Sequence, residues 1–363
     1  ISPVFPVFPV VQNFNLMPLH AELHRHLGGS IVPRIFWRFL HRQGHPLALE
    51  YPDYDDFEAF LTRPRNSLSE FLELHTMIEQ VQTIQTLPYF ITKLVRGAYV
   101  FEGLVYLELR HTPYYRTDHK REEGERILQM REVVKVIRDA ANLPDYPLRL
   151  RQILCMHSRL PNHINKAIIE LAARERDTVC AVDLAGPDVL YAERIPEFIE
   201  LFQYARLLGL KTTCHLFETA NGAYPELLPY VDRIGHGIHI PLQMPELLPQ
   251  IRDRGQCLEV CPTSYLKTGT LQSLESLRRV FVECEKANVD IAICTDNPGL
   301  HNVRLPFEYE NLLSLDIIDF HTLRRCQNAA FRHAFAWPHR DPPDSILPLL
   351  TGSGSPAPFT ERG

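Results

Sequence analysis

Short apolar segments alternate with longer amphipathic segments along most of the chain. The short segments are rich in β-branched residues and are bounded by turn-forming residues, which is typical of buried strands. Eight strands are predicted, at residues 19–26, 105–112, 148–156, 178–186, 210–218, 233–237, 256–262 and 289–296. The longer segments carry apolar residues at helical spacing. The clearest predicted helices lie at residues 32–43, 121–141, 162–176, 195–209, 244–255 and 271–288.

The order of these elements predicts a (β/α)8 barrel of the TIM type. A strand followed by a helix, repeated along the chain, favours parallel β/α units. Eight such units in a chain of 363 residues fit one closed barrel. Further helical patterns at residues 47–100, such as "SLSEFLELHTMIEQVQ", predict a helical insertion after the first strand.

The patterning predicts one structured domain with two irregular ends. We expect a single barrel domain over residues 18–340. Residues 1–17 place three prolines in the first nine positions and lack a basic start, which favours an extended arm over a signal helix. Residues 341–363 are rich in Pro, Gly and Ser, which is typical of a loose tail.

Composition narrows the class of protein. The chain is 45% hydrophobic and 23% charged, an ordinary balance for a globular protein. A net charge of −6 argues against a nucleic-acid partner, which would favour a basic face. No run reaches the ~18 apolar residues of a membrane span. The eight cysteines form no CxxC pair, so we expect reduced, buried thiols in a cytoplasmic protein.

Polar residues follow the predicted strands at the end where barrel enzymes place their chemistry. They are His24 and His26 after strand 1, His215 and Glu218 after strand 5, His236 after strand 6, and Asp296 and Asn297 after strand 8. Residues two apart in a strand point the same way, so His24 and His26 are expected to face the barrel axis together.

Three imidazoles and a carboxylate make a zinc site with room for a water molecule. Zinc lowers the pKa of that water toward ~7 and so provides hydroxide at neutral pH. Each residue alone has a plainer interpretation. Asp296 precedes Asn-Pro-Gly and could simply form a turn, and Glu218 could be a carboxylate at a helix N-terminus. Their joint position at the ends of strands 1, 5, 6 and 8 favours the metal site.

Seven motifs identify a family. They are "AELHRHLGGS", "YLELRHTP", "VDLAGPD", "HLFE", "DRIGHGIH", "LEVCPTSYLKTG" and "ICTDNPG", in this order along nearly the whole chain. With them the chain resembles the adenosine deaminase family of the amidohydrolase superfamily. The resemblance implies a zinc hydrolase that removes the 6-amino group of adenosine or a close adenine nucleoside, giving an inosine-type product and ammonia. The expected partner is thus a small purine nucleoside or nucleotide.

The resemblance also implies a role for each motif residue. The implied zinc ligands are His24, His26, His215 and Asp296. Glu218 matches the acid that protonates purine N1, and His236 matches the histidine that orients the attacking water. Gly186 matches the glycine whose backbone N–H meets purine N3. The segment "VDLAG" lacks the lysine that bridges two metals in binuclear relatives, so one Zn²⁺ per chain is expected.

Two departures from the family pattern bear on the substrate. Gly28 stands where adenosine deaminases carry an acid that contacts the sugar 5′ hydroxyl. It either forms the turn after strand 1 or leaves more room for a different 5′ end. The alternative substrates are then N6-methyl-AMP-like nucleotides or aminofutalosine-like nucleosides. Asn297 replaces an aspartate that donates to purine N7, and its amide is a permanent donor that could keep this contact.

Other polar residues have less specific interpretations. Glu108 and Arg110 are predicted to form a buried ion pair beneath the site. Ser264, in the segment 261–269, could bond His236 or a substrate phosphate, or belong to a polar loop. A function of another class, an inactive barrel that acts as a binding module, is disfavoured because every metal and acid–base position is filled.

Overall fold

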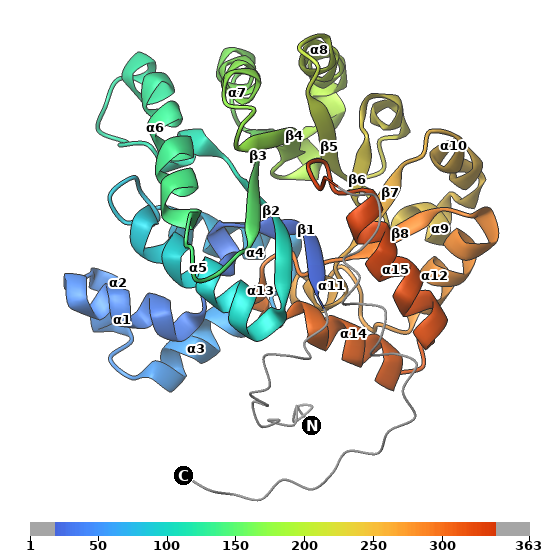
Figure 1. The fold of residues 1–363 in the computed structure, drawn as a ribbon, viewed down its shortest axis with the longest axis horizontal. Coiled ribbons are helices and arrows are strands. Elements are labelled where there is room, and N and C mark those ends of the chain that lie inside the picture. Colours follow the sequence, from blue (N-terminus) through green and yellow to red (C-terminus); the bar gives the residue numbers. More distant parts are fainter. Residues whose placement is uncertain (1–18, 339–363) are drawn as a thin grey trace, which may run out of the picture.

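The computed structural model describes residues 19–338. Within them, eight parallel strands form one sheet in sequence order, as predicted (Figure 1). The strands are β1 (His20–His26), β2 (Leu104–His111), β3 (Arg149–His157), β4 (Val179–Ala185), β5 (Lys211–Leu216), β6 (Arg233–His236), β7 (Cys257–Val260) and β8 (Asp290–Ile293). The arm expected at 1–17 and the tail expected at 341–363 lie outside the described residues.

The barrel closes where the segment after β8 meets β1. A parallel bridge joins Arg25 to Asp296. His26 N donates to Asp296 O at 2.7 Å, and Asp296 N donates to His24 O at 2.8 Å. The closing bridge therefore brings the two histidines of strand 1 beside the aspartate that follows strand 8, through backbone bonds alone.

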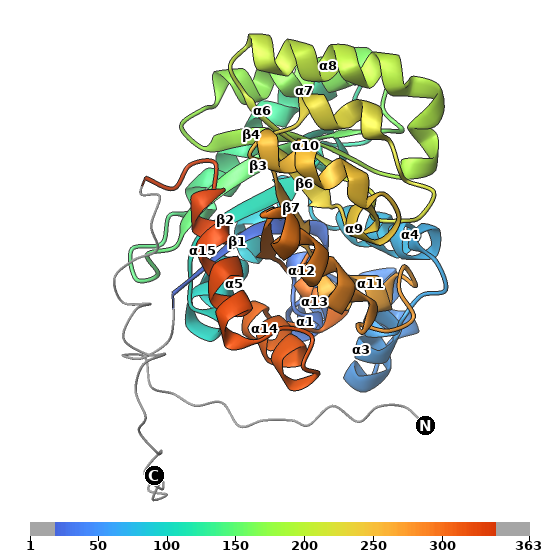
Figure 2. The ribbon, with the colours of Figure 1, turned by 90° about the vertical axis from the view of Figure 1, so that its right-hand side faces the viewer.

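Helices surround the strands, as the (β/α)8 pattern predicts (Figures 1 and 2). The longer outer helices are α6 (Glu123–Ala141), α7 (Asn162–Arg174), α8 (Ile195–Leu207), α12 (Ser276–Ala287) and α15 (Phe320–Arg332). The shorter α-helices are α9 (His239–Gln243), α10 (Leu248–Asp253), α11 (Pro262–Lys267), α13 (Pro298–His301) and α14 (Leu305–Ser314). The short 3-10 helices are η2 (Pro113–Arg116), η3 (Asp188–Leu190), η4 (Ala192–Arg194), η5 (Pro225–Tyr230) and η6 (Pro245–Leu247). Helix α15 packs against β8 and β1 and so covers the closing bridge from outside.

The predicted insertion after strand 1 is helical. Residues 47–100 contain most of α2 (Pro46–Glu50), all of α3 (Tyr54–Thr62) and α4 (Leu68–Glu79), and most of α5 (Leu87–Glu102). Before them lie η1 (Gly28–Ser30) and α1 (Pro33–Gln43), which matches the helix predicted at residues 32–43. Helix α4 begins at a capping serine, since Ser67 Oγ accepts from Glu70 N, and its buried residues Phe71, Leu74 and Ile78 follow a helical spacing. Helix α4 packs against η1, so the insertion reaches the end of strand 1.

Two further expectations can be compared with the structure. All eight cysteines are free, and seven are buried. Among residues 19–338, no helix is long and apolar enough to cross a bilayer.

Candidate metal centre

Three histidine side chains converge at the carboxyl end of the barrel. One ring nitrogen from each of His24, His26 and His215 lies within 4.8 Å of the others. His26 Nε2 lies 3.0 Å from His215 Nε2, and His24 Nε2 is buried with no hydrogen-bond partner among residues 19–338. Converging imidazole nitrogens are donors of the type that zinc prefers, so this cluster fits a metal ion.

Asp296 adds a carboxylate to the three histidines. Its Oδ1 lies 3.4 Å from His26 Nε2 and 3.7 Å from His24 Nε2. Ser264 Oγ donates to Asp296 Oδ2 at 2.6 Å, and Asn297 Nδ2 donates to Oδ1 at 2.7 Å. Ser264 therefore has a partner that the sequence did not predict. The segment 261–269 contains helix α11 and not only a loop, and that helix carries the hydroxyl to Asp296.

The charge states of His24 and His26 suit metal binding. Burial, and then the charge of Arg110, lower the pKa of His24 well below its usual range. Burial, and then His215, lower the pKa of His26 in the same way. Both imidazoles are therefore neutral at physiological pH, and only a neutral imidazole can offer a lone pair to a metal.

Buried carboxylates orient two of these rings. Glu259 Oε2 lies 2.7 Å from His24 Nδ1, and Asp183 Oδ2 lies 3.1 Å from His215 Nδ1. Burial alone would raise the pKa of Glu259, but the charges of Arg110 and Arg233 outweigh it and lower the pKa. An ionised carboxylate accepts the Nδ1–H, which leaves Nε2 of His24 with its lone pair toward the site.

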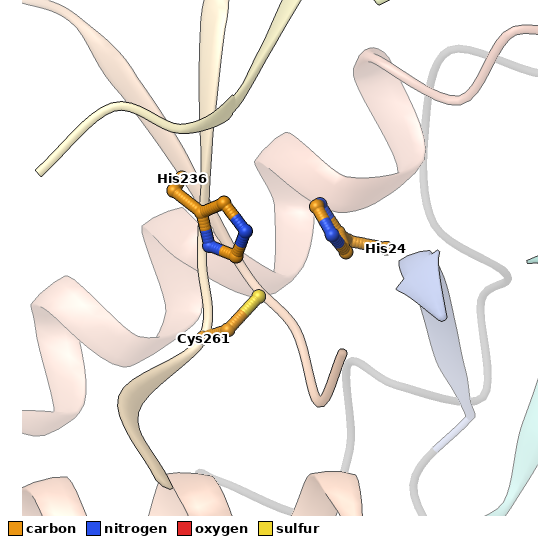
Figure 3. Close-up of side chains that lie close together, drawn as sticks. All are labelled: His24, His236 and Cys261. Atoms are coloured by element: carbon orange, nitrogen blue, oxygen red, sulfur yellow. The ribbon is translucent and has the colours of Figure 1, made fainter. Parts of the chain in front are cut away.

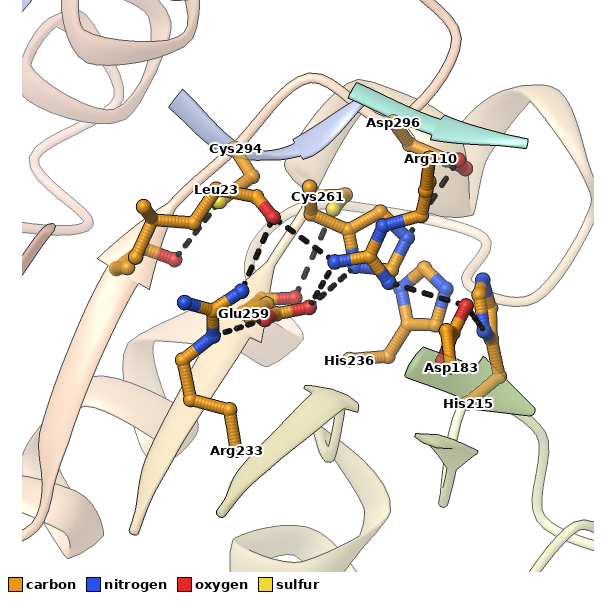
Figure 4. A network of polar contacts seen from close by, with 12 residues as sticks. Leu23, Arg110, Asp183, His215, Arg233, His236, Glu259, Cys261, Cys294 and Asp296 are labelled. Carbon is orange, nitrogen blue, oxygen red and sulfur yellow. Dashed lines mark hydrogen bonds and ion pairs between the residues drawn. The ribbon is translucent and has the colours of Figure 1, made fainter. Parts of the chain in front are cut away.

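Glu259 belongs to a buried ion network that spans the barrel interior (Figure 4). Its second oxygen, Oε1, lies 2.5 Å from Arg233 Nε, and its Oε2 lies 2.8 Å from Arg110 Nη2. Arg233 Nη2 lies 2.5 Å from Glu108 Oε2. The predicted Glu108–Arg110 pair is therefore wrong. Both side chains point into the barrel from β2, but each is matched by a charge from another strand.

Left-handed backbone conformations occur at the strand ends that carry the site. The φ angles of Phe217, His236 and Asp296 are 53°, 64° and 61°. Such angles are uncommon for residues other than glycine and persist only where the surrounding structure holds them. They turn the chain sharply after β5, β6 and β8, so the adjacent side chains face the common centre.

Glu218 and His236 lie beside the metal ligand cluster. His236 Nε2 is 3.4 Å from Glu218 Oε2, and both side chains are nearly fully buried. Burial, and then the charge of Asp296, raise the pKa of Glu218 to about 8. At neutral pH this carboxyl is therefore mostly protonated and can act as a proton donor.

A second group of possible ligands overlaps the first (Figure 3). Ligand atoms of His24, His236 and Cys261 also lie within 4.8 Å of one another. Burial, and then Cys294, raise the pKa of the Cys261 thiol well above its usual range. A metal binds the thiolate and not the thiol, so the chemistry favours the three-histidine group.

Gly186 lies at the end of β4 in a conformation that favours glycine. Its φ is 98°, and a Cβ there would lie 2.6 Å from His157 Cε1 and 2.7 Å from Ser158 Oγ. No side chain fits without displacing these neighbours. Only glycine therefore fits at position 186, directly after β4 and beside His157 and Ser158.

Gly28 is not beside open space. A Cβ on Gly28 would lie 2.4 Å from His75 Nε2 and 3.1 Å from Glu79 Cγ. The expectation that this glycine leaves more room is wrong in that respect, because a side chain of helix α4 fills the position. No local pattern in the sequence indicated this contact, since Gly28 and His75 are 47 positions apart.

Comparisons with known proteins show the family and the fold. The adenosine deaminase family model matches residues 19–341. The adenosine deaminase of Clostridium acetobutylicum is 29% identical over 307 residues, which cover 83% of this chain and 87% of that one. An amidohydrolase structure from Burkholderia ambifaria with bound Zn has a TM-score of 0.72 at 21% identity, covering 89% of this chain and 86% of that one. The N6-mAMP deaminase of Arabidopsis has a TM-score of 0.71 at 23% identity, and the match covers 88% of this chain and 94% of that one. These two structures share the fold.

The carboxylate behind His24 leads to a prediction about metal affinity. Glu259→Gln should weaken metal binding about 10–100-fold, because the neutral amide no longer holds the ring in the orientation that frees Nε2. The affinity is measured by competition with a chelator of known strength, and circular dichroism checks that the variant is folded.

Glu246→Gln provides the matched control, because Glu246 is an exposed acid in η6. It should leave the affinity unchanged. A folded Glu259→Gln variant with the metal affinity of the unmodified protein would contradict the role given to Glu259.

Proposed function

The chain belongs to the adenosine deaminase family and is a purine deaminase, and we propose that it deaminates adenosine or a closely related adenine nucleoside by hydrolysis. The observation that carries this proposal is the cluster of His24, His26, His215 and Asp296 beside the protonated carboxyl of Glu218. The product would be the inosine-type nucleoside, with release of ammonia.

We assign one Zn²⁺ per chain to His24, His26, His215 and Asp296. The unpartnered Nε2 of His24 and the facing nitrogens of His26 and His215 support this assignment. The bound Zn of the Burkholderia ambifaria amidohydrolase also supports it. When bound, zinc makes a water molecule acidic enough to act as a nucleophile at neutral pH.

Glu218 and His236 are assigned to the proton transfers. Glu218 is protonated at neutral pH because of its raised pKa, so it can give its proton to purine N1 as a water oxygen adds to C6. His236 is assigned to orient that water, since its Nδ1 is buried without a partner among the described residues. As that water adds to C6 it loses a proton, which His236 accepts and passes to the 6-amino nitrogen. The C6–N bond then breaks and ammonia leaves, while the proton of the C6 hydroxyl returns to Glu218 and leaves the 6-oxo product.

Gly186 and Asn297 are assigned to hold the purine ring. The backbone N–H of Gly186 would meet N3. One N–H of the Asn297 amide is used by Asp296, which leaves a second N–H to donate to N7. An aspartate at this position would need a proton to avoid repulsion from Asp296, whereas the amide donates at any pH.

A second candidate within the same chemistry rests on the missing acid at position 28, and not on extra room there, because His75 fills that space. Without an acid at this position, the substrate could be a 5′-modified nucleoside or an N6-substituted nucleotide of the N6-methyl-AMP type. The Arabidopsis N6-mAMP deaminase, similar in fold, fits this alternative. A role as a binding module without catalysis is disfavoured, since each assigned metal and acid–base residue is present.

Metal analysis and a substrate panel test the proposal. We expect one zinc per chain. We also expect release of ammonia from adenosine to be faster than release of ammonia from AMP or aminofutalosine, or of methylamine from N6-methyl-AMP. A protein purified without zinc, and not activated by zinc, would contradict the proposed mechanism. Turnover of a nucleotide without turnover of adenosine would favour the second candidate.

Glu218→Gln should retain zinc and lose about 10²–10⁴-fold in kcat, because the amide cannot donate a proton to N1. Zinc content and steady-state kinetics are measured on the same preparation. The exposed residue Glu226, in η5, gives the control variant Glu226→Gln, which should keep full activity. An unchanged kcat in Glu218→Gln would disprove the assigned role.

7-Deazaadenosine, which lacks the N7 acceptor, should react about tenfold more slowly than adenosine, because one hydrogen bond is lost. In Asn297→Ala the two substrates should react at equal rates, since the donor is absent. Both comparisons use kcat/KM. Equal rates for the two substrates in the unmodified enzyme would exclude a contact between Asn297 and N7.

A further inference from the structure

The imidazole of His75 occupies the direction in which a side chain at position 28 would point. A Cβ on Gly28 would lie 2.4 Å from both Cε1 and Nε2 of His75. The ring of His75 also meets the ring of His26 edge-on, with centroids 5.8 Å apart. His75 therefore lies beside the ligand cluster, at the position where relatives carry an acid on the turn after strand 1.

A closed ring of contacts holds His75 in place. His75 Nδ1 lies 3.6 Å from Glu79 Oε2, and Arg116 Nη2 lies 2.8 Å from Glu79 Oε1. Arg116 Nη1 donates to Gln82 Oε1 at 3.1 Å, and Gln82 Nε2 donates to Gly28 O at 3.0 Å. Arg116 and Gln82 are fully buried. This series of contacts begins and ends at Gly28. Such a closed network holds the side chain of His75 in one position.

Glu79 brings a negative charge to this end of the site. Burial alone would raise its pKa, but His75 and Arg116 outweigh burial and lower the pKa of Glu79 to about 2. The carboxylate is therefore ionised at neutral pH. Its charge also acts on His157, the residue that touches Gly186. Glu79 therefore lies beside Gly28, and His157 lies beside Gly186.

The region between these two glycines is where the sugar would lie, and that step rests on the proposed function. Purine N3 and the sugar-bearing N9 are attached to the same ring carbon. With N3 at Gly186, the sugar must therefore leave the purine on the Gly186 side. The 5′ end of the sugar then extends toward Gly28, where His75 and Glu79 meet it.

We propose that His75 and Glu79 form the subsite for the 5′ end of the sugar and select a 5′ hydroxyl over a 5′ phosphate. His75 Nε2 is buried and has no hydrogen-bond partner among residues 19–338, so it is available to a hydroxyl group. The adjacent carboxylate of Glu79 repels a phosphate, and the guanidinium of Arg116 is already bonded to Glu79 and Gln82. The inference makes an adenine nucleoside the substrate class.

The test compares kcat/KM for adenosine, 5′-deoxyadenosine and AMP in the zinc-loaded, full-length enzyme and its variants. The unmodified enzyme should prefer adenosine to both analogues, by about tenfold for the single hydrogen bond to the 5′ hydroxyl. In His75→Ala the ratio of kcat/KM for adenosine to kcat/KM for 5′-deoxyadenosine should fall to about one. In Glu79→Gln the preference for adenosine over AMP should fall about tenfold. His75→Gln keeps a polar group and should retain part of the preference.

The control is Glu73→Gln, which changes an exposed acid on the same helix and should leave all three ratios unchanged. For any folded variant with low turnover, the dissociation constants of inosine and 5′-deoxyinosine compare binding with and without the 5′ hydroxyl, and this measurement does not require catalysis. The inference is overturned if His75→Ala keeps the 5′-hydroxyl preference, if Glu79→Gln leaves the AMP ratio unchanged, or if the unmodified enzyme prefers AMP. Absence of ammonia release from every adenine compound would overturn the proposed function instead.

Discussion

The carboxylate of Glu259 is the interaction on which the rest of the centre depends. It is fully buried and bonded at once to Arg110, Arg233 and His24. Ions removed from water cost several kcal/mol each unless every partner is in place, so the network admits one arrangement of β1, β2, β6 and β7. The same contact sets the orientation of the His24 ring. Stability of the barrel interior and geometry of the proposed metal ligand His24 are therefore properties of one group of side chains (Figure 4).

Hydrophobic periodicity was enough to predict the fold. A parallel barrel repeats one local pattern, an apolar strand followed by an amphipathic helix. Each repeat can be recognised from its own residues, so all eight strands and the helical insertion could be predicted. The histidines and acids at the strand ends could be found for a related reason. Parallel strands bring their carboxyl ends together, so residues distant in sequence share one edge. Their ring orientations, in contrast, depend on Glu259 and Asp183, which were not assigned a role.

Pairings across the barrel interior could not be predicted from local sequence. Glu108 and Arg110 are two residues apart on one strand, and that spacing suggested a pair. Their actual partners depend on which strands face each other across the interior and at what height, which no local pattern encodes. The same holds for Gly28 and His75. A glycine in the sequence suggests empty space at its own position. Only the packing of α4 on η1 shows that His75 fills the space beside Gly28.

The bridge between Arg25 and Asp296 has a thermodynamic consequence. It is the place where the two edges of the sheet meet, and the side chains of His26 and Asp296 extend from it into the ligand cluster. A ligand held jointly by these two side chains binds the closed barrel and not an opened one. Binding at the centre therefore raises the free energy needed to open the barrel locally. Conversely, a change that makes opening easier weakens binding at the centre.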